Sequence, residues 1–220
     1  MINWMHALLH DPRRGWDPVS SEYAGKYGQQ VACDEELVSQ FERALDGLPG
    51  KRVVDLGSGP GQFAAEFARR GADVTCIDVS ANYLSLAAAR FQAAGLSATF
   101  VAGYMDQVNR LTGGGFDGAF SHVSWYYCMN DVCFAKRIVQ SLRPGGVAFI
   151  RANTGAFEPI RSRRRRLVYW LNDNLLWKVG HPHPPRGRIA SVFERIGDCK
   201  VEVAYSEPTA DVVITRRNRG

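Results

Sequence analysis

The chain has 220 residues, of which 45% are apolar, and a net charge of +5, a composition that suits one globular domain with a sizeable core. Its five cysteines are scattered and no two frame a CxxC, which argues against a disulfide framework and against a thiolate zinc site. No apolar run approaches the ~20 residues of a membrane span and residues 1–14 offer no clean signal segment, so we expect a cytoplasmic protein.

The first half of the chain alternates helical and extended patterns. Leu37, Phe41 and Leu45 recur at helical spacing behind Asp34, which can cap a helix. After that helix, the pattern predicts strands at 52–56, 74–77 and 99–102, and helices around Phe63 and Phe67 and over 83–94. This alternation is typical of a parallel sheet with crossover helices.

The second half continues the alternation and then departs from it. The pattern predicts a strand at 116–121, a helix over 131–142, a turn at 144–146 and a strand at 147–150. A helical insertion over 160–179 and a proline-rich loop at 181–185 follow. The chain then closes with a helix over 189–196 and a hairpin formed by 201–205 and 212–215.

One segment carries the clearest chemical signal, the run Val53-Val54-Asp55-Leu56-Gly57-Ser58-Gly59-Pro60-Gly61. A strand enters a glycine-rich turn and leaves it as a helix, so the backbone can approach a ligand closely at the carboxyl edge of a sheet. Asp78 ends the next predicted strand, where a carboxylate can accept hydrogen bonds from ribose hydroxyls. The pair indicates a nucleoside-containing cofactor.

This turn differs from the dinucleotide fingerprint, because its third glycine comes one residue early and Pro60 intervenes. The segment closely resembles the first motif of the class I S-adenosylmethionine-dependent methyltransferases. Three further stretches are similar to motifs of that family: 77–80, 116–122 and 142–146. The resemblance covers roughly residues 34–151 and the terminal hairpin.

The resemblance implies an α/β fold, with a Rossmann-like, seven-stranded, mostly parallel sheet, flanking helices and a C-terminal antiparallel hairpin. It also implies a single methyltransferase domain spanning 1–220, with an N-terminal cap at about 1–33 and a helical insertion or lid at about 156–188. The expected cofactor is S-adenosyl-L-methionine, which leaves as S-adenosyl-L-homocysteine.

The resemblance also assigns residues of the glycine turn. Gly57, Ser58, Gly59 and Gly61 would pass close to the methionine part of the cofactor, and Asp55 would brace the loop. The alternative for the glycines is a tight turn without a ligand.

The remaining cofactor candidates follow the second, third and fourth predicted strands. Asp78 would hold the ribose, and Val79 and Ser121 are further candidates. Family members usually show Gly-Asp after the third strand, whereas this chain has Gly103-Tyr104-Met105-Asp106. Met105 is assigned to the cofactor site, and Asp106 either reads the adenine from a shifted position or is a solvated loop carboxylate.

The sequence says less about the residues that would bind the methyl acceptor. Methyl transfer from a sulfonium mainly needs alignment, so a general base is optional. His122, at the end of the fourth strand, is the catalytic candidate, although it could equally pack or contact the cofactor. Tyr23, Tyr27 and Tyr126 are candidates for the acceptor pocket, with ordinary packing as the alternative for each. A metal site is not expected, since the loop with His181 and His183 is simply rich in proline.

An arginine-rich run, Arg161 to Arg166, favours a solvated basic face, from which Arg161 is the candidate to clamp an acidic acceptor. A phosphate backbone is the alternative partner, which would make the acceptor RNA or another nucleic acid. The stretch 121–124 lacks the Asn/Asp-Pro-Pro-aromatic tetrapeptide of enzymes that methylate base amino groups. A small, anionic or aromatic acceptor is therefore favoured. A third hypothesis is a protein that binds the cofactor for another chemistry or a non-catalytic role.

Overall fold

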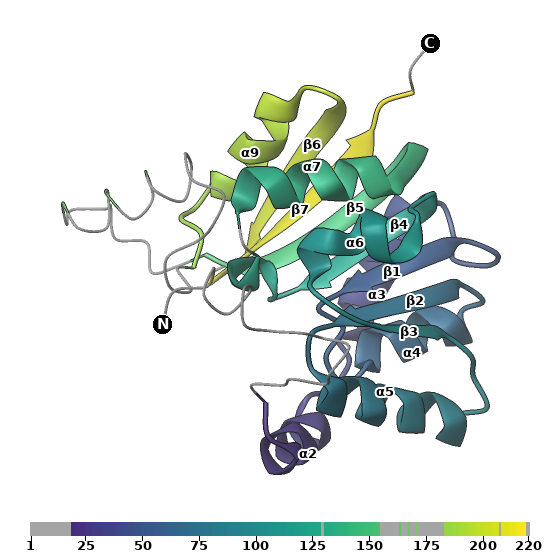
Figure 1. Cartoon of the computed structure of the whole chain (residues 1–220). Coiled ribbons are helices and arrows are strands. Elements are labelled where there is room, and N and C mark those ends of the chain that lie inside the picture. Colours follow the sequence, from purple (N-terminus) through teal and green to yellow (C-terminus); the bar gives the residue numbers. More distant parts are fainter. Residues whose placement is uncertain are drawn as a thin grey trace.

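The computed structural model describes residues 19–128, 130–154, 163, 167, 170, 183–206 and 208–218. Its centre is a seven-stranded sheet in the order β3-β2-β1-β4-β5-β7-β6 (Figure 1). β7 runs antiparallel to both β5 and β6, whereas the pairs from β3 to β5 are parallel. The strands are β1 (Arg52–Leu56), β2 (Asp73–Asp78), β3 (Thr99–Ala102), β4 (Phe116–His122), β5 (Leu142–Asn153), β6 (Cys199–Ser206) and β7 (Thr209–Arg216). The predicted fold class is confirmed.

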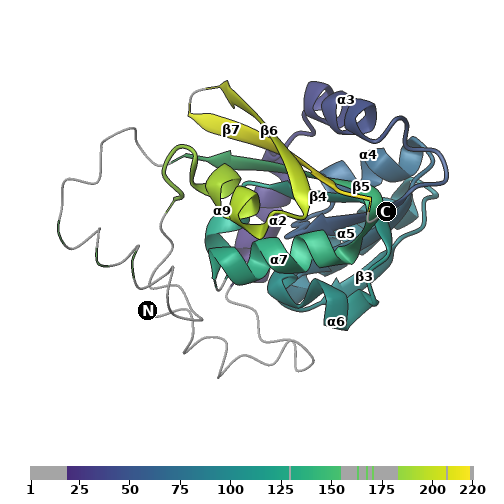
Figure 2. The same ribbon diagram turned by 90° about the horizontal axis from the view of Figure 1, so that it is seen from above.

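Helices cover both faces of the sheet (Figure 2). One face carries α3 (Glu35–Ala44), α4 (Gln62–Arg69) and α5 (Ala81–Ala93), and the other carries α6 (Val108–Thr112), α7 (Asp131–Ser141) and α9 (Arg188–Ile196). The N-terminal helix α2 (Ser21–Gln30) contacts α5. Two short 3-10 turns, η2 (Met105–Gln107) and η3 (Trp125–Tyr127), follow β3 and β4.

Each face has its own aromatic core. Under α3 and α4, the ring of Phe120 lies 5.2 Å from Phe41 and 4.9 Å from Phe67, measured between centroids. On the opposite face, Trp125 lies 5.1 Å from Phe134 and 5.9 Å from Phe193. All of these side chains are fully buried, and each contributes about 1.5–3 kcal/mol to stability through burial. The two cores pack the helices against both faces of the sheet.

Most predicted elements match the structure to within a few residues, but the start of β5 does not. The sequence pattern places Leu142 in the preceding helix and begins the strand at Val147, whereas α7 ends at Ser141 and β5 begins at Leu142. Leu142 pairs with Phe116, and the next paired residues are Gly118 and Val147, so the intervening turn forms an irregularity within the ladder. The prediction was wrong because this pairing depends on β4, not on local periodicity.

Candidate active site

The site begins at the turn that joins β1 to α4. Its three glycines, Gly57, Gly59 and Gly61, all have positive φ angles of 74°, 52° and 73°. A Cβ atom on Gly57 would lie 2.7 Å from the Cβ of Ser124, and one on Gly61 would lie 2.8 Å from that of Ala87. A Cβ on Gly59 would meet nothing within 4 Å, so the backbone there borders open space. The turn is therefore tightly supported at both ends and open in the middle.

Asp78 ties this turn to the end of β2. One carboxylate oxygen accepts a hydrogen bond of 2.8 Å from the backbone N–H of Gly59, and the other accepts one of 2.8 Å from the N–H of Ser80. The backbone N–H groups of Gly57 and Ser58 both donate to the carbonyl of Ile77. The predicted neighbourhood of Asp78 and the glycine turn is therefore present in the structure.

Asp55 lies beneath the turn and is almost completely buried. Burial, followed by the charge of Asp78, raises the pKa of the Asp55 carboxyl to about 8. A further contact at this turn comes from Ser124, whose hydroxyl donates to the carbonyl of Leu56 at 2.9 Å. Ser121 and Ser124 share a further hydrogen bond of 2.7 Å between their hydroxyls. Ser121 thus supports the turn through Ser124.

The turn η2 places Met105 and Asp106 beside the same site. Met105 is buried, and its sulfur lies 3.8 Å from the position of a Cβ on Gly57. Burial and the neighbouring Asp106 raise the pKa of Tyr104 to about 12. Contact of Met105, Asp106 or Val79 with an adenosine group stays a prediction.

His122 stands at the carboxyl end of β4, paired in register with Arg151 of β5. Its imidazole packs against Phe63 of α4, with 4.6 Å between ring centroids. Burial, followed by the charge of Arg151, lowers the pKa of His122 to about 4. Arg151 itself pairs with Asp211 at 2.6 Å and with Asp34 at 3.2 Å. His122 is therefore neutral at physiological pH.

The residue after His122 has an unusual backbone. Val123 has a φ angle of 54°, which β-branched residues rarely adopt, and its N–H donates to the carbonyl of Arg151 at 2.7 Å. This left-handed kink turns the chain so that Ser124 reaches the glycine turn and η3 follows. Strained residues of this kind cluster at functional sites.

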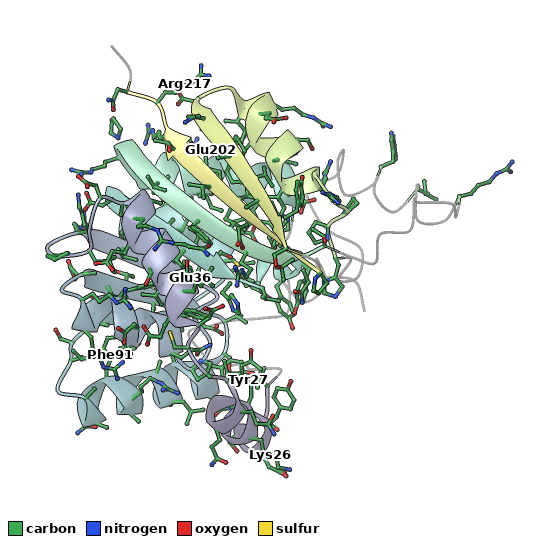
Figure 3. All side chains as sticks on the ribbon, turned by 180° about the vertical axis from the view of Figure 1, so that it is seen from behind. Lys26, Tyr27, Glu36, Phe91, Glu202 and Arg217 are labelled. Atoms are coloured by element: carbon green, nitrogen blue, oxygen red, sulfur yellow. The ribbon has the colours of Figure 1, made fainter. Side chains whose placement is uncertain are left out.

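Tyrosines from three elements gather at this edge of the sheet. Tyr23 and Tyr27 of α2 stack with 6.2 Å between centroids, and Tyr27 lies 5.7 Å from Tyr83 of α5. Tyr27 lies on the side of α2 that faces the rest of the domain (Figure 3). Burial, followed by Tyr23, Tyr127 and Asp78, raises the pKa of Tyr27. Burial raises the pKa of Tyr83, and Asp78, which ends β2, also contributes to raising it.

The wall after β4 completes this aromatic group. The ring of Tyr126 lies 4.3 Å from that of Tyr127 and 4.8 Å from the imidazole of His183. Burial raises the pKa of Tyr126, and Tyr127, Tyr27 and Tyr23 raise it further. Contact of Tyr23, Tyr27 or Tyr126 with a methyl acceptor stays a prediction.

Some functional positions were missed and some candidates cannot be placed. Tyr83, Ser124 and Gln62 all lie at the site, but each depends on contacts that local sequence patterns do not reveal. Arg161 and His181 fall outside the described residues. In the described part of the chain, no group of His, Cys, Asp or Glu could hold a metal ion, and no helix is long and apolar enough to cross a membrane.

Comparisons with known proteins agree with this geometry. Residues 53–146 match the family model described as a methyltransferase domain. The chain is 30% identical over 129 residues to a ubiquinone biosynthesis O-methyltransferase of Psychrobacter arcticus, which covers 56% of this chain and 48% of the relative. It is 46% identical over 86 residues to a magnesium-protoporphyrin O-methyltransferase of Rhodobacter capsulatus, covering 37% of this chain and 38% of that protein.

A solved structure gives the same result for the fold. An S-adenosylmethionine-dependent methyltransferase from Clostridium acetobutylicum superposes with a TM-score of 0.65 at 14% identity, covering 90% of this chain and 98% of the other. The chain spans about half or less of the length of the curated relatives it matches. The strand order, the glycine turn with Asp78 and the matched family together identify residues 53–146 as a methyltransferase domain of the class I S-adenosylmethionine-dependent family.

Proposed function

We propose that this chain transfers the methyl group of S-adenosylmethionine to an oxygen atom of a small aromatic molecule. One observation carries the proposal: the backbone at Gly59 borders open space and donates a hydrogen bond to Asp78, and tyrosines of α2, α5 and η3 lie beside this position. The names of the two curated relatives, both O-methyltransferases, support oxygen as the methylated atom.

The residues present fit this cofactor. The backbone of Gly59 borders open space, and the buried side-chain oxygen of Gln62, the first residue of α4, has no hydrogen-bond partner among the described residues. The cofactor supplies hydrogen-bond donors from which this oxygen can accept a bond. Its ribose hydroxyls can likewise donate hydrogen bonds to the Asp78 carboxylate. When bound, the cofactor provides a methyl group already activated on a sulfonium. Gly59, Gln62 and Asp78 would hold it.

The chain's own contribution is to bind and align the acceptor. An in-line displacement needs the attacking oxygen close to the methyl group and aligned with it, and a rigid aromatic wall supplies that orientation at low entropic cost. Because the pKa of His122 is low, its imidazole would accept a hydrogen bond from an acceptor hydroxyl without removing the proton. An acceptor that is already ionised, such as an acidic phenol or a carboxylate, needs no stronger base.

Calorimetry with S-adenosylhomocysteine tests the cofactor half of the proposal. We expect binding in the wild type and a loss of at least about tenfold in Asp78→Asn, because ribose hydrogen bonds to a charged acceptor are lost. Asp73→Asn is the matched control, since Asp73 lies at the opposite end of the same strand. A nicotinamide dinucleotide should not bind. Absence of S-adenosylhomocysteine binding in the wild type contradicts the proposal.

Transfer of an isotope-labelled methyl group tests the acceptor half. A panel of acidic phenols, aromatic carboxylates, aliphatic carboxylates and short RNA duplexes separates the hypotheses. We expect label in the aromatic compounds, and less in Tyr126→Ala, because the ring at the wall is lost. Label in RNA alone would refute the small-molecule proposal.

A further inference from the structure

The N-terminal helix α2 rests on α5 and on the glycine turn at once. Ala24, in the middle of α2, is buried. A Cβ on Gly28 would lie 3.5 Å from Leu86 of α5 and 3.6 Å from Pro60 of the turn, so the helix backbone sits directly on both. Figure 1 shows α2 beside α5, apart from the other helices. This helix brings Tyr27 close to Tyr83 and Asp78.

Two side chains of α5 fasten the two ends of this helix. The amide of Asn82 donates to the carbonyl of Val19, just before α2, at 2.8 Å. At the other end, the guanidinium of Arg90 donates through Nη2 to the carbonyl of Gly28 at 3.4 Å and through Nε to that of Pro60 at 3.0 Å. Arg90 therefore connects α2 to the glycine turn with a single side chain.

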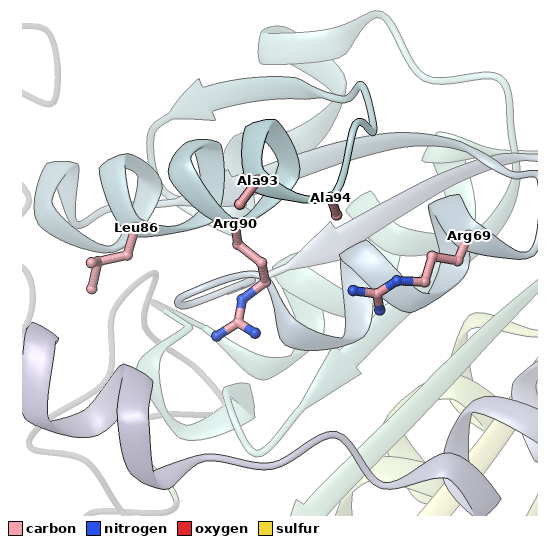
Figure 4. Close-up of a pocket in the computed structure, with 5 residues that line it drawn as sticks. All are labelled: Arg69, Leu86, Arg90, Ala93 and Ala94. Atoms are coloured by element: carbon pink, nitrogen blue, oxygen red, sulfur yellow. The ribbon is translucent and has the colours of Figure 1, made fainter.

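A neighbouring arginine provides a natural comparison. Arg90 extends from α5 and Arg69 from α4 into the same surface groove (Figure 4). Arg69 pairs with Glu66 on its own helix at 2.9 Å, three residues away. The two arginines thus share a groove and a charge, but only Arg90 bonds to α2 and to the turn among the contacts of the described residues.

From these contacts we infer that Arg90 is a positioning residue that couples the seating of α2 to the conformation of the cofactor turn. Pro60 lies between Gly59, which borders the open space, and Gly61, which Ala87 of α5 supports. Lifting α2 breaks the bond of Arg90 to Gly28 and frees the guanidinium that holds Pro60. Release of a bound cofactor and lifting of α2 are therefore linked. This inference rests on the proposed function only where it concerns the cofactor.

Hydrogen exchange of the ligand-free full chain tests the coupling without any cofactor. In Arg90→Met, which keeps the apolar stem, we expect amides of residues 21–30 and of 57–62 to exchange about tenfold faster, because a charge-assisted hydrogen bond is lost at each segment. Amides of β4 should not change, and Arg69→Met should match the wild type throughout. Equal exchange in the two variants, or faster exchange in α2 alone, overturns the inference.

The cofactor arm uses S-adenosylhomocysteine as the probe. In Arg90→Met we expect its dissociation rate to rise about tenfold and the KM for S-adenosylmethionine to rise with it, while kcat is retained. A purely structural loss would instead reduce the folded fraction and the apparent kcat. Arg90→Lys keeps the charge but replaces the two bonding nitrogens by one, so its dissociation rate for S-adenosylhomocysteine should lie between those of the wild type and Arg90→Met. It serves if Arg90→Met does not fold.

The two arms separate the two possible failures. If the wild type binds no S-adenosylhomocysteine, the proposed function fails and the exchange data still judge the coupling. If α2 and the turn both loosen while cofactor dissociation is unchanged, the inference is overturned and the proposed function stands.

Discussion

Substitution of two neighbouring glycines by alanine should separate the structural part of the cofactor turn from its binding part. Gly57 and Gly59 both have positive φ angles, so alanine at either position carries a backbone cost of about 1–2 kcal/mol. Only Gly57 lies against another residue, since its added Cβ would be 2.7 Å from the Cβ of Ser124. Forcing a methyl group into such a packed site costs a further 1–3 kcal/mol, roughly.

The expected losses of unfolding free energy therefore differ. Gly57→Ala should lose about 2–5 kcal/mol and Gly59→Ala about 1–2 kcal/mol. Urea unfolding of the ligand-free chain measures both, and an unchanged m-value shows that the comparison is valid. The reasoning is refuted if the two variants lose the same stability.

Binding should show the reverse order. The methyl group of Gly59→Ala enters the open space that the cofactor would occupy, so affinity for S-adenosylhomocysteine should fall at least about tenfold although this variant loses less stability than Gly57→Ala. Ser124→Gly removes the Cβ with which the alanine methyl group of Gly57→Ala would clash, so adding it to Gly57→Ala should restore part of the lost stability. The same change in Gly59→Ala should restore none, and a double-mutant cycle measures the difference.

Three further outcomes follow from buried charges. The pKa of Asp55 is raised by burial and Asp78 to about 8, from 3.8, so the folded state holds the extra proton between these values and stability falls as pH rises through that range. Asp55→Asn should flatten this slope, as urea unfolding at several pH values would reveal; an unchanged slope would contradict the assignment. Arg188→Met should cost about 3–5 kcal/mol, because it removes the ion pair that the Nε of Arg188 makes at 3.1 Å with the buried carboxylate of Asp131. Adding Asp131→Asn should cost less than the sum of the single changes, and strict additivity would count against the pair. Since burial and Arg151 lower the pKa of His122 to about 4, its imidazole should show no titration by NMR near pH 6.5; a midpoint there, lost in His122→Gln, would argue against this burial.

The glycine turn and the sheet were predictable because their signals are local. Only glycine readily adopts three positive φ angles within five residues, so Gly57, Gly59 and Gly61 indicate a sharp turn wherever the chain places them. A carboxylate at the end of the next strand must then reach the same edge, because neighbouring parallel strands end together. Asp78 follows from the order of strands alone.

The supports of the turn were not predictable, because they join segments far apart in the chain. Ser124 contacts Leu56 across 68 residues, and Arg90 contacts Gly28 across 62. Serine and arginine are ordinary surface residues in any local pattern, and nothing in their neighbours distinguishes them. The kink at Val123, which turns Ser124 toward Gly57, is equally invisible, since valine predicts an extended backbone.

The segment after β4, which we propose as a wall of the acceptor site, is built differently from the glycine turn, and this difference bears on how acceptor choice could vary. Its base is rigid, because the buried Trp125 donates from its indole nitrogen to Asp131 at 3.0 Å, and Asp131 in turn pairs with Arg188 at the start of α9. Two residues later, Tyr127 has an exposed fraction of 54%. Substitutions at the exposed Tyr127 would alter the shape and polarity of this segment at little cost in stability, whereas substitutions at the base would disturb a buried ion pair. Under the proposed function, η3 would therefore be a segment through which acceptor choice can change while the sheet and the glycine turn stay fixed.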